Sequence, residues 1–356
     1  MKLTAKLKLL PTPEQHHALL QTLETANQAC NAISQQAWEH QTFRRVPLHH
    51  LVYRQTRERF GLSAQMVVRQ IAKVADSYRA RRQGQHTFSP HGAIAYDDRI
   101  LSWRVEEQEV SIWTVDGRQR IPFACGAHQR ALLDSRRGES DLCLVEGVFY
   151  LCATCEVETP PLGEVEGYLG VDLGIVNLAT DSDGEVFCGR QLNAVRHRHA
   201  RLRRKLQRKG SKSAKRLLRK RRRKERRFAR DVNHCIAKRL VAKAQGTARG
   251  IALEELGGIR ERVTVAKRQR RRHHSWAFDD LRRKIVYKAE RAGVQVRVVD
   301  PRYTSRQCPV CGCRDKRNRR TQSEFSCVSC GYSGHADHVA AVNIGRRAAV
   351  NQPDVS

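Results

Sequence analysis

The sequence predicts an α+β protein of several domains, in which a β-rich first half carries an inserted helical unit and an α/β region with a small metal-binding insertion follows. Three observations predict this architecture. Short apolar runs separated by turn residues fill positions 86–160, strands alternate with helices from residue 167 onward, and five of the 12 cysteines crowd between Cys308 and Cys330. A length of 356 residues is ample for more than one core.

A strand, Lys2–Leu10, opens the chain and leads into a helix. Thr12 is a suitable N-cap, Pro13 occupies the first helical position, and Gln15 completes a capping box. Apolar residues then recur at steps of three and four, which predicts one buried helical face: Leu19, Leu23, Ala26, Cys30 and Ile33. A second helix is expected after Ser63, with Val67, Ile71, Val74 and Tyr78 on one face. We expect these two helices to pack together as a small unit.

The pattern changes to short strands between Thr87 and Glu158. Four apolar or alternating runs are expected to form strands: Leu101–Val105, Glu109–Val115, Leu142–Val145 and Val148–Val157. The turn signals between them are Asp116-Gly117, Arg137-Gly138 and Glu146-Gly147. Such a meander is a β-domain, which the opening strand joins if the helical pair is an insertion. Cys152 and Cys155 lie three residues apart in the last run, so they should face opposite sides, and we interpret them as core residues rather than as a metal site.

Pro160-Pro161 marks a boundary, after which strands and helices alternate. A strand, a turn and a second strand come first, over the stretches Tyr168–Gly174 and Leu178–Gly184. The later elements are a buried strand over Ile251–Leu256 that ends at Gly257-Gly258, an amphipathic helix over Trp276–Ala292 closed by Gly293, and a strand over Val294–Val299. This alternation predicts an α/β domain with a mixed sheet.

The chain carries 67 Lys and Arg against 36 Asp and Glu, a formal net charge of +31. No apolar stretch is long enough to span a bilayer, and lysines interrupt the apolar residues of the N-terminus, so we expect a soluble cytoplasmic protein with no membrane partner. Nucleic acid is the expected partner for so much positive charge. A solvated basic surface, or a base-rich genome that favours Arg codons, is the alternative.

The charge is concentrated, which argues against that alternative. Positions 196–230 hold 20 Lys and Arg and one acid, Glu225. We expect two helices here, broken at Gly210-Ser211. Like charges at helical spacing destabilise a helix unless a partner such as phosphate neutralises them, so we expect these helices to bind nucleic acid. The candidate contacts are Arg203, Arg204, Lys205, Arg216, Arg219, Lys220, Arg221, Arg222, Arg223 and Arg227. A second basic cluster spans Arg260–His274.

Two C-x-x-C-G knuckles predict a structural zinc site. Cys308 and Cys311 form the first knuckle, and Cys327 and Cys330 form the second. This spacing is typical of a zinc ribbon, in which four thiolates fill a tetrahedral site and leave no open position. Cys313 lies outside the knuckle register. Buried free cysteines or a redox pair are the alternatives.

Three acids lie within apolar, strand-like segments: Asp172, Glu254 and Asp337. A carboxylate in such a place costs several kcal/mol unless it is paired or bound to a cation. Salt bridges to arginine are one explanation. The other is a converging set of carboxylates that holds two Mg²⁺ ions for phosphodiester hydrolysis. The spacing of the three acids does not decide whether they meet, and alternation does not choose between Glu254 and its neighbour Glu255.

About residues 167–345 resemble the TnpB (OrfB) proteins of insertion sequences. Gly170-Val-Asp172-Leu-Gly174, followed by Leu178-Ala-Thr-Asp-Ser-Asp-Gly184, is similar to the first RuvC motif of the family. Leu253-Glu254-Glu255-Leu256 is similar to the second, in which the first acid is catalytic. Two further blocks match the approach to the zinc ribbon, Tyr287-Lys-Ala-Glu290-x-x-Gly293 and Val299-Asp-Pro-x-Tyr303-Thr-Ser305-x-x-Cys308. Asp337-x-x-Ala-Ala-x-Asn343-Ile344 is similar to the third RuvC motif.

The resemblance implies an RNase H-like (RuvC) α/β domain with an inserted zinc ribbon, preceded by a β-rich wedge domain with a helical, recognition-like insertion. The implied divisions are a first wedge strand at 1–12, the helical insertion at 13–85, the wedge domain at 86–160, the RuvC-like nuclease domain at 161–306 with basic helices at 195–245, the zinc ribbon at 307–332 and the end of the RuvC-like domain at 333–356. The N-terminal half matches the family in layout only.

The implied function is that of a transposon-encoded, RNA-guided DNA endonuclease of a prokaryote, associated with the nucleoid. Its partners would be a guide RNA from the transposon end and double-stranded target DNA. Asp172, Glu254 and Asp337 would hold two catalytic Mg²⁺ ions, and Cys308, Cys311, Cys327 and Cys330 would hold Zn²⁺. The third motif departs from the family, which often reads D-R-D-x-N-A-A where this chain reads His335-Ala-Asp337-His338-Val339-Ala-Ala. We expect activity to survive because the metal ligand remains.

Two other functions stay open. One is a nuclease-silent RNA-guided DNA-binding repressor, which would need a lost acid. The other is a guide-independent nuclease or recombinase of the RuvC type.

Overall fold

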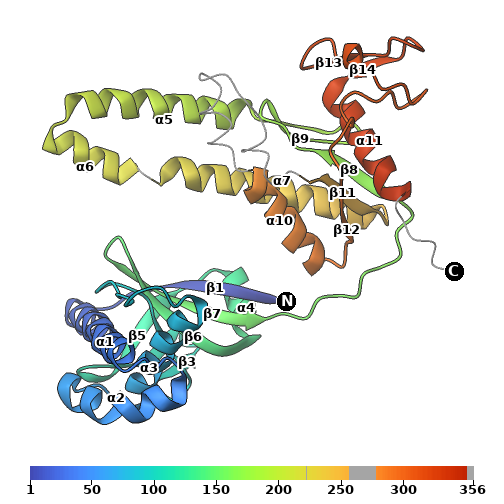
Figure 1. The fold of residues 1–356 in the computed structure, drawn as a ribbon. Helices are drawn as coiled ribbons and strands as arrows, with labels where there is room; N and C mark the ends of the chain where they lie inside the picture. The colour runs from blue at the N-terminus through green and yellow to red at the C-terminus, as the bar shows by residue number, and fades with distance from the viewer. Residues whose placement is uncertain (222, 256–277, 351–356) are drawn as a thin grey trace. The chain divides into compact units, whose positions relative to one another are not determined.

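A computed structural model of the chain describes residues 1–221, 223–255 and 278–350. It divides into two compact units, Met1–Glu158 and Thr159–Ser356 (Figure 1). Each unit has its own hydrophobic core. Among the described residues, none of the helices is both long enough and apolar enough to cross a membrane.

A seven-stranded sheet forms the frame of the first unit, in the order β2-β6-β7-β1-β5-β4-β3. The strands are β1 (Lys2–Leu9), β2 (Ile94–Tyr96), β3 (Leu101–Arg104), β4 (Glu109–Thr114), β5 (Gly117–Ala124), β6 (Arg136–Val145) and β7 (Val148–Glu156). The opening strand β1 lies between β7 and β5 and is antiparallel to both. The helices that follow β1 in sequence are therefore an insertion into this sheet.

Three helices make up that insertion: α1 (Pro13–Glu39), α2 (Arg45–Phe60) and α3 (Ala64–Ala80). A short helix, α4 (Ala127–Leu133), follows β5. The capping box of Thr12 and Gln15 is present, as predicted. The two predicted helices, α1 and α3, are present and pack together, but the expectation of only two helices was wrong, because α2 was missed. Its buried stripe is narrow, with Leu48, Val52 and Thr56 one turn apart, and gives little periodic signal.

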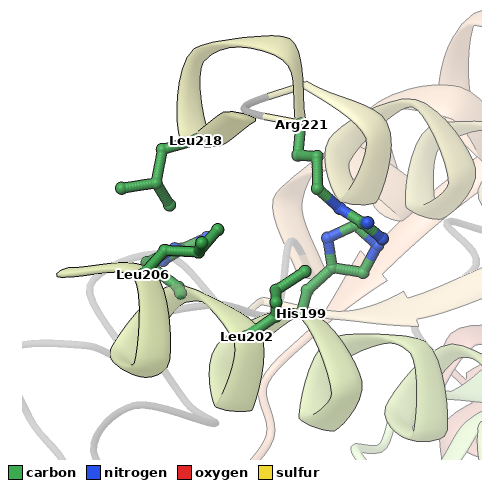
Figure 2. Close-up of a pocket in the computed structure, with 6 residues that line it drawn as sticks. His199, Leu202, Leu206, Leu218 and Arg221 are labelled. Atoms are coloured by element: carbon green, nitrogen blue, oxygen red, sulfur yellow. The ribbon is translucent and has the colours of Figure 1, made fainter. Parts of the chain in front are cut away.

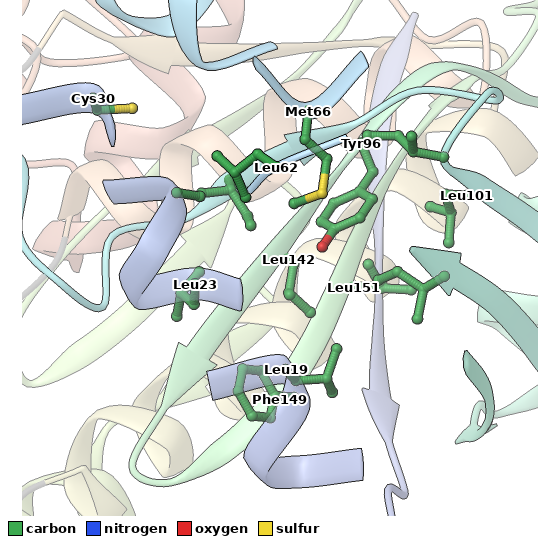
Figure 3. Packing of buried hydrophobic residues seen from close by; sticks show 14 of the residues in the cluster. Leu19, Leu23, Cys30, Leu62, Met66, Tyr96, Leu101, Leu142, Phe149 and Leu151 are labelled. Carbon is green, nitrogen blue, oxygen red and sulfur yellow. The ribbon is translucent and has the colours of Figure 1, made fainter. Parts of the chain in front are cut away.

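The core of the first unit lies between α1, α3 and the sheet. Figure 3 shows Leu19 and Leu23 of α1 facing Leu142 and Phe149 of the sheet, and Tyr96 is also fully buried there. The apolar faces predicted for α1 and α3 are buried, as apolar residues repeated at helical spacing require.

The turn predicted at Arg137-Gly138 is wrong. Both residues lie inside β6, where the pairing with β7 shifts between Arg136 and Ser140 and Gly138 has a φ of 68°. A bulge at a glycine has the same local sequence as a turn, since both need a left-handed residue. Cys155 is buried and Cys152 is half-buried, so the two do face opposite sides of β7.

Within its described residues, the second unit contains a five-stranded sheet in the order β10-β9-β8-β11-β12. Its strands are β8 (Tyr168–Asp172), β9 (Asn177–Asp181), β10 (Val186–Cys188), β11 (Gly250–Glu254) and β12 (Val296–Val299). Strands β8, β11 and β12 are parallel, whereas β8, β9 and β10 are antiparallel. The predicted mixed sheet is confirmed. A two-stranded ribbon, β13 (Glu324–Ser326) with β14 (Ser333–His335), precedes the last helix.

Helix α11 (Ala336–Val350) packs directly on β8 (Figure 1). A glycine from each element makes this possible. A Cβ on Gly170 would lie 2.0 Å from the carbonyl oxygen of Ala341, and one on Gly345 would lie 2.9 Å from that of Tyr168. The helix can therefore approach the strand at backbone distance, which brings its first turn close to the end of β8.

The basic segment forms α5 (Arg190–Lys209), α6 (Lys212–Arg221) and α7 (Lys224–Gly246). The predicted break is confirmed at Gly210, which has a φ of 64°. The prediction of two helices was wrong, because a third, α7, begins within the predicted second helix. Helix α10 (Phe278–Arg291) packs on α7. Gly257-Gly258, the cluster Arg260–His274 and the start of the helix predicted at Trp276 lie outside the described residues.

Candidate active site and metal centre

Two of the three predicted acids end neighbouring parallel strands. Asp172 is the last residue of β8 and Glu254 is the last residue of β11. In the register of this pair, Val171 faces Leu253, so the two acids follow side by side at the carboxyl ends of their strands. Apolar residues earlier in both strands are buried in the core of the unit, which leaves the acids at the rim of the sheet.

The third acid, Asp337, lies in the first turn of α11. Two side chains contact its carboxylate. Asn177 of β9 donates from Nδ2 to Oδ2 at 2.9 Å, and Arg319 places Nη2 3.6 Å from Oδ1. Arg319 comes from the segment between the two cysteine knuckles, so this segment and the sheet both reach Asp337.

Asp172 lies close enough to Glu254 and Asp337 for the charges of both to act on it. Burial, together with the charges of Glu254 and Asp337, raises the pKa of Asp172 to about 8. Burial also raises the pKa of Glu254, while a hydrogen bond from Thr304 opposes this shift. Arg319 favours the charged form of both acids but does not balance the cluster. The site therefore has a net shortage of positive charge, although the protein as a whole has a large excess.

Glu255 points elsewhere, toward α10. Its carboxylate pairs with Arg282 at 3.0 Å, and half of its side chain is exposed. The two neighbours therefore differ in position: Glu254 lies beside Asp172, and Glu255 lies in a surface ion pair.

The donor set of the acid cluster suits a hard divalent cation. Carboxylate oxygens are the ligands that Mg²⁺ prefers, and a buried carboxylate held next to two others is stabilised by a cation more than by any neutral partner. Asp172, Glu254 and Asp337 are the residues that would hold it.

Four further residues of this site were not predicted as site residues from the sequence. They are Asn177, Thr304, Arg319 and Asn343. Thr304 and Asn343 lie in blocks that resemble TnpB motifs, but the spacing of these residues does not indicate which atoms they contact. Arg319 was noted only as part of a basic loop.

The four predicted zinc ligands converge. The sulfur atoms of Cys308, Cys311, Cys327 and Cys330 all lie within 4.8 Å of one another. Sγ of Cys308 is 3.6 Å from that of Cys330, and Sγ of Cys311 is 3.5 Å from that of Cys327. Zn–S bonds of ~2.3 Å in a tetrahedron require sulfur atoms ~3.8 Å apart. The geometry therefore fits a closed Zn²⁺ site.

The thiols of the two knuckles act on one another, and hydrogen bonds with the other sulfur atoms raise the pKa of Cys330 to about 12. Backbone N–H groups of Cys330 and Ser329 lower the pKa of Cys327 to about 6, which favours the thiolate. Cys313 is not one of the four ligands. Its carbonyl oxygen accepts from the backbone N–H of Cys308 at 2.9 Å, which closes the first knuckle.

The departure in the third motif has a structural counterpart. Val339 stands where the family often has Asn, and it is fully buried in a small core with Cys308, Phe325 and Cys327. An amide there would need partners that this apolar core lacks, so valine suits the local packing.

The basic helices present most of their predicted contacts to solvent. Eight of the ten candidates are exposed: Arg203, Arg204, Lys205, Arg216, Arg219, Lys220, Arg223 and Arg227. Arg221 was expected on the outer face, but it is half-buried. Figure 2 shows it beside His199, lining a cavity of about 30 Å³ with Leu202, Leu206 and Leu218. Arg222 lies outside the described residues.

Two family models match separate segments of the chain. A family model described as "Probable transposase" (OrfB_IS605) matches residues 152–256, and one described as "Cas12f1-like, TNB domain" matches residues 278–344. A TnpB-like protein of Methanocaldococcus jannaschii is 33% identical over 47% of this chain and 63% of its own length. The resemblance to the TnpB (OrfB) family is confirmed.

Two proteins named as DNA endonucleases are similar as well. The CRISPR-associated endodeoxyribonuclease Cas12f1 of Sulfoacidibacillus thermotolerans is 40% identical over 33% of this chain and 26% of its own length. The putative RNA-guided DNA endonuclease InsQ of Escherichia coli is 30% identical over 56% of this chain and 53% of its own length. The chain thus spans between about a quarter and two thirds of the TnpB and Cas12f relatives described here.

The fold extends the likeness over nearly the whole chain. The Cas12f1 chain in a structure titled "Cryo-EM structure of the Cas12f1-sgRNA-target DNA complex" matches 94% of this chain and 83% of its own, with a TM-score of 0.62 and 14% identity. The chain therefore has a Cas12f-like fold of mixed α/β content with a β-sheet domain.

Proposed function

We propose that this chain is an RNA-guided DNA endonuclease encoded by a transposon, which cuts target DNA with a RuvC-like acid cluster that holds two Mg²⁺ ions. The observation that carries the proposal is that Asp172 lies close enough to Glu254 and Asp337 for both charges to act on it, where two parallel strand ends and a helix start come together. A buried carboxylate beside two other acids, as at Asp172, is costly for the fold, and metal binding at a catalytic site would explain this cost. The relatives' names supply the guided character of the reaction.

Each part of the chain has a role in this proposal. Bound Mg²⁺ ions would activate water and stabilise the leaving oxygen of a phosphodiester. Asp172, Glu254 and Asp337 would hold them, with Asn177 orienting Asp337. The guanidinium of Arg319 borders the cluster and would attract the scissile phosphate. The exposed cations of α5, α6 and α7 would bind the phosphates of guide RNA or target DNA. The four-cysteine site would hold Zn²⁺ in an RNase H-like domain with an inserted zinc ribbon.

The deciding experiment is cleavage of a plasmid that matches a supplied guide RNA, in Mg²⁺. We expect Asp172→Ala to lower the cleavage rate by orders of magnitude while the affinity for guide RNA and target stays close to that of the wild type. Glu255→Gln is the control, since Glu255 pairs with Arg282 at the surface and should keep most activity.

Two outcomes would contradict the proposal. A wild-type protein that binds guide and target without cutting in any divalent cation would be a guided repressor. Cutting that does not depend on the guide sequence would indicate a guide-independent nuclease.

A further inference from the structure

The loop between β12 and the first cysteine knuckle carries a buried hydroxyl that contacts the acid cluster. Thr304 is 2% exposed. Its Oγ1 lies 2.5 Å from Oε1 of Glu254 and 2.9 Å from the carbonyl oxygen of Pro301. A threonine hydroxyl has one proton, and the shorter contact to a charged acceptor assigns that proton to Glu254.

Two side chains of α11 hold this loop by its carbonyl groups. Asn343 is 6% exposed, and its Nδ2 donates to the carbonyl oxygens of Thr304 and Gln307, both at 2.8 Å. One helical turn later, Nη1 of Arg347 donates to two further loop carbonyls, those of Asp300 at 2.5 Å and Arg302 at 2.9 Å. The position of Thr304 is therefore set by the same helix that carries Asp337.

We infer that Thr304 is a positioning residue for Glu254, and that Asn343 and Arg347 hold Thr304 in place for this purpose. The inference rests on the proposed function and deepens it. A glutamate side chain has three rotatable bonds, and one hydrogen bond to a fixed donor removes much of that freedom. Threonine suits the role because branching at Cβ restricts its own χ1 rotation.

The donor to Glu254 is the uncharged Thr304 hydroxyl, which supports a role in cation binding. A lysine or arginine at this place would also orient Glu254, but it would neutralise the carboxylate and compete with a metal ion. A neutral hydroxyl orients the carboxylate and leaves its charge. Asp337 also has a neutral donor, the amide of Asn177 at 2.9 Å, and the guanidinium of Arg319 lies farther away, at 3.6 Å. Such donors behind metal ligands commonly contribute tenfold to a hundredfold in metal affinity or activity.

A purely structural role is the competing explanation, since the hydroxyl is also close to the Pro301 carbonyl within its own loop. The two explanations differ in what removal of the hydroxyl changes. A loop-stabilising hydroxyl affects the unfolding temperature. A hydroxyl that positions Glu254 affects the affinity of the acid cluster for a divalent cation.

The test compares Thr304→Val with Thr304→Ser in the full chain. Binding of Mn²⁺ is measured by electron paramagnetic resonance, and the Mg²⁺ concentration for half-maximal cleavage is measured in parallel. We expect Thr304→Val to weaken Mn²⁺ binding and to raise the Mg²⁺ requirement by about tenfold, whereas Thr304→Ser stays within about twofold of the wild type. Zinc content and affinity for nucleic acid should not change. If valine prevents folding, Thr304→Ala replaces it and should give the same result.

The matched control is Thr22→Val in the first unit. The Thr22 hydroxyl is also buried, donates to the Ala18 carbonyl at 2.7 Å and accepts from the Val115 N–H at 3.0 Å, so its removal should be at least as costly for folding. This variant should bind Mn²⁺ like the wild type. The inference is overturned if Thr304→Val lowers the unfolding temperature but keeps the wild-type Mn²⁺ affinity and Mg²⁺ requirement. A wild-type chain that neither binds Mn²⁺ at the acids nor cuts DNA would instead contradict the proposed function itself.

Discussion

At the scale of single residues, Asp172 is where burial and charge conflict most directly. Its carboxylate ends a core strand and lies close to two other acids, and its pKa rises from an ordinary value of 3.8 to about 8. Because the pKa in the folded protein is above that of the unfolded chain, the residue destabilises the fold increasingly as pH rises through this interval. The residue is costly for stability and valuable for cation binding, a combination typical of functional sites.

This conflict makes a prediction about Asp172→Asn. Without divalent cations at pH 8, the variant should be more stable than the wild type by more than about 1 kcal/mol, or ~2–4 °C in unfolding temperature, because the amide has nearly the same shape and no charge. The difference should disappear near pH 4, where the wild-type carboxyl is protonated in the folded protein. Added Mg²⁺ should stabilise the wild type only. Calorimetry at both pH values, with and without Mg²⁺, measures these effects, and equal stability at pH 8 would contradict the prediction.

At the scale of elements, α11 connects the acid cluster with the cysteine segment. Its first turn carries Asp337, its middle holds the Thr304 loop through Asn343, and Arg346 contacts the Pro309 carbonyl inside the first knuckle. The helix lies against β8 at backbone distance because of Gly170. A disturbance of the knuckles should therefore reach Asp337 through this helix.

Cys308→Ser tests that connection. If the four sulfur atoms hold one Zn²⁺, as proposed, the variant should lose it, because an alcohol is a poor zinc ligand and the remaining thiols cannot close the tetrahedron. Hydrogen exchange should increase in residues 307–333 and in the first turn of α11. Elemental analysis and exchange mass spectrometry measure the two effects.

The control for this experiment is Cys235→Ser. Cys235 is exposed on α7 and belongs to no cysteine cluster among the described residues, so this variant should keep its zinc and its exchange pattern. Soluble, active wild-type protein without zinc would refute the assignment of the site.

At the scale of the whole molecule, the net charge of +31 does not indicate where on the surface nucleic acid would bind. The exposed cations of α5, α6 and α7 are the densest group, and the hairpin of α5 and α6 has little core of its own: Leu192 and Ala214 are its buried residues. Replacing Arg216, Arg219 and Arg223 with Gln should flatten the dependence of nucleic-acid affinity on salt by up to about one logarithmic unit per lost phosphate contact. Fluorescence anisotropy at several salt concentrations measures the slope.

A charge-matched control separates local contacts from net charge. Arg54, Arg57 and Arg59 are exposed on α2 of the first unit. Replacing them with Gln removes the same charge. An equal change of slope in both triple variants would mean that the total charge, rather than the basic helices, determines the binding.

The sequence by itself determined the features that depend on neighbours along the chain. The capping box at Thr12, the buried face of α1, the break at Gly210 and the two cysteine knuckles each follow from local spacing, because helix geometry and tight turns are set within a few residues. Local reasoning failed where the periodic signal was weak, as in α2, or ambiguous, as at Gly138 in β6.

Only the tertiary structure decided which distant groups meet. It placed Glu254 rather than Glu255 beside Asp172, brought Asn177 to Asp337, and put the Thr304 hydroxyl on Glu254. The packing of α5 against α6 likewise decided that Arg221 lines the cavity between them instead of facing solvent. These contacts join residues that lie tens to more than a hundred positions apart, and they depend on strand register and on the close approach of α11 to β8. Spacing along the chain carries no information about such distances, because they exist only once the sheet and helix have packed.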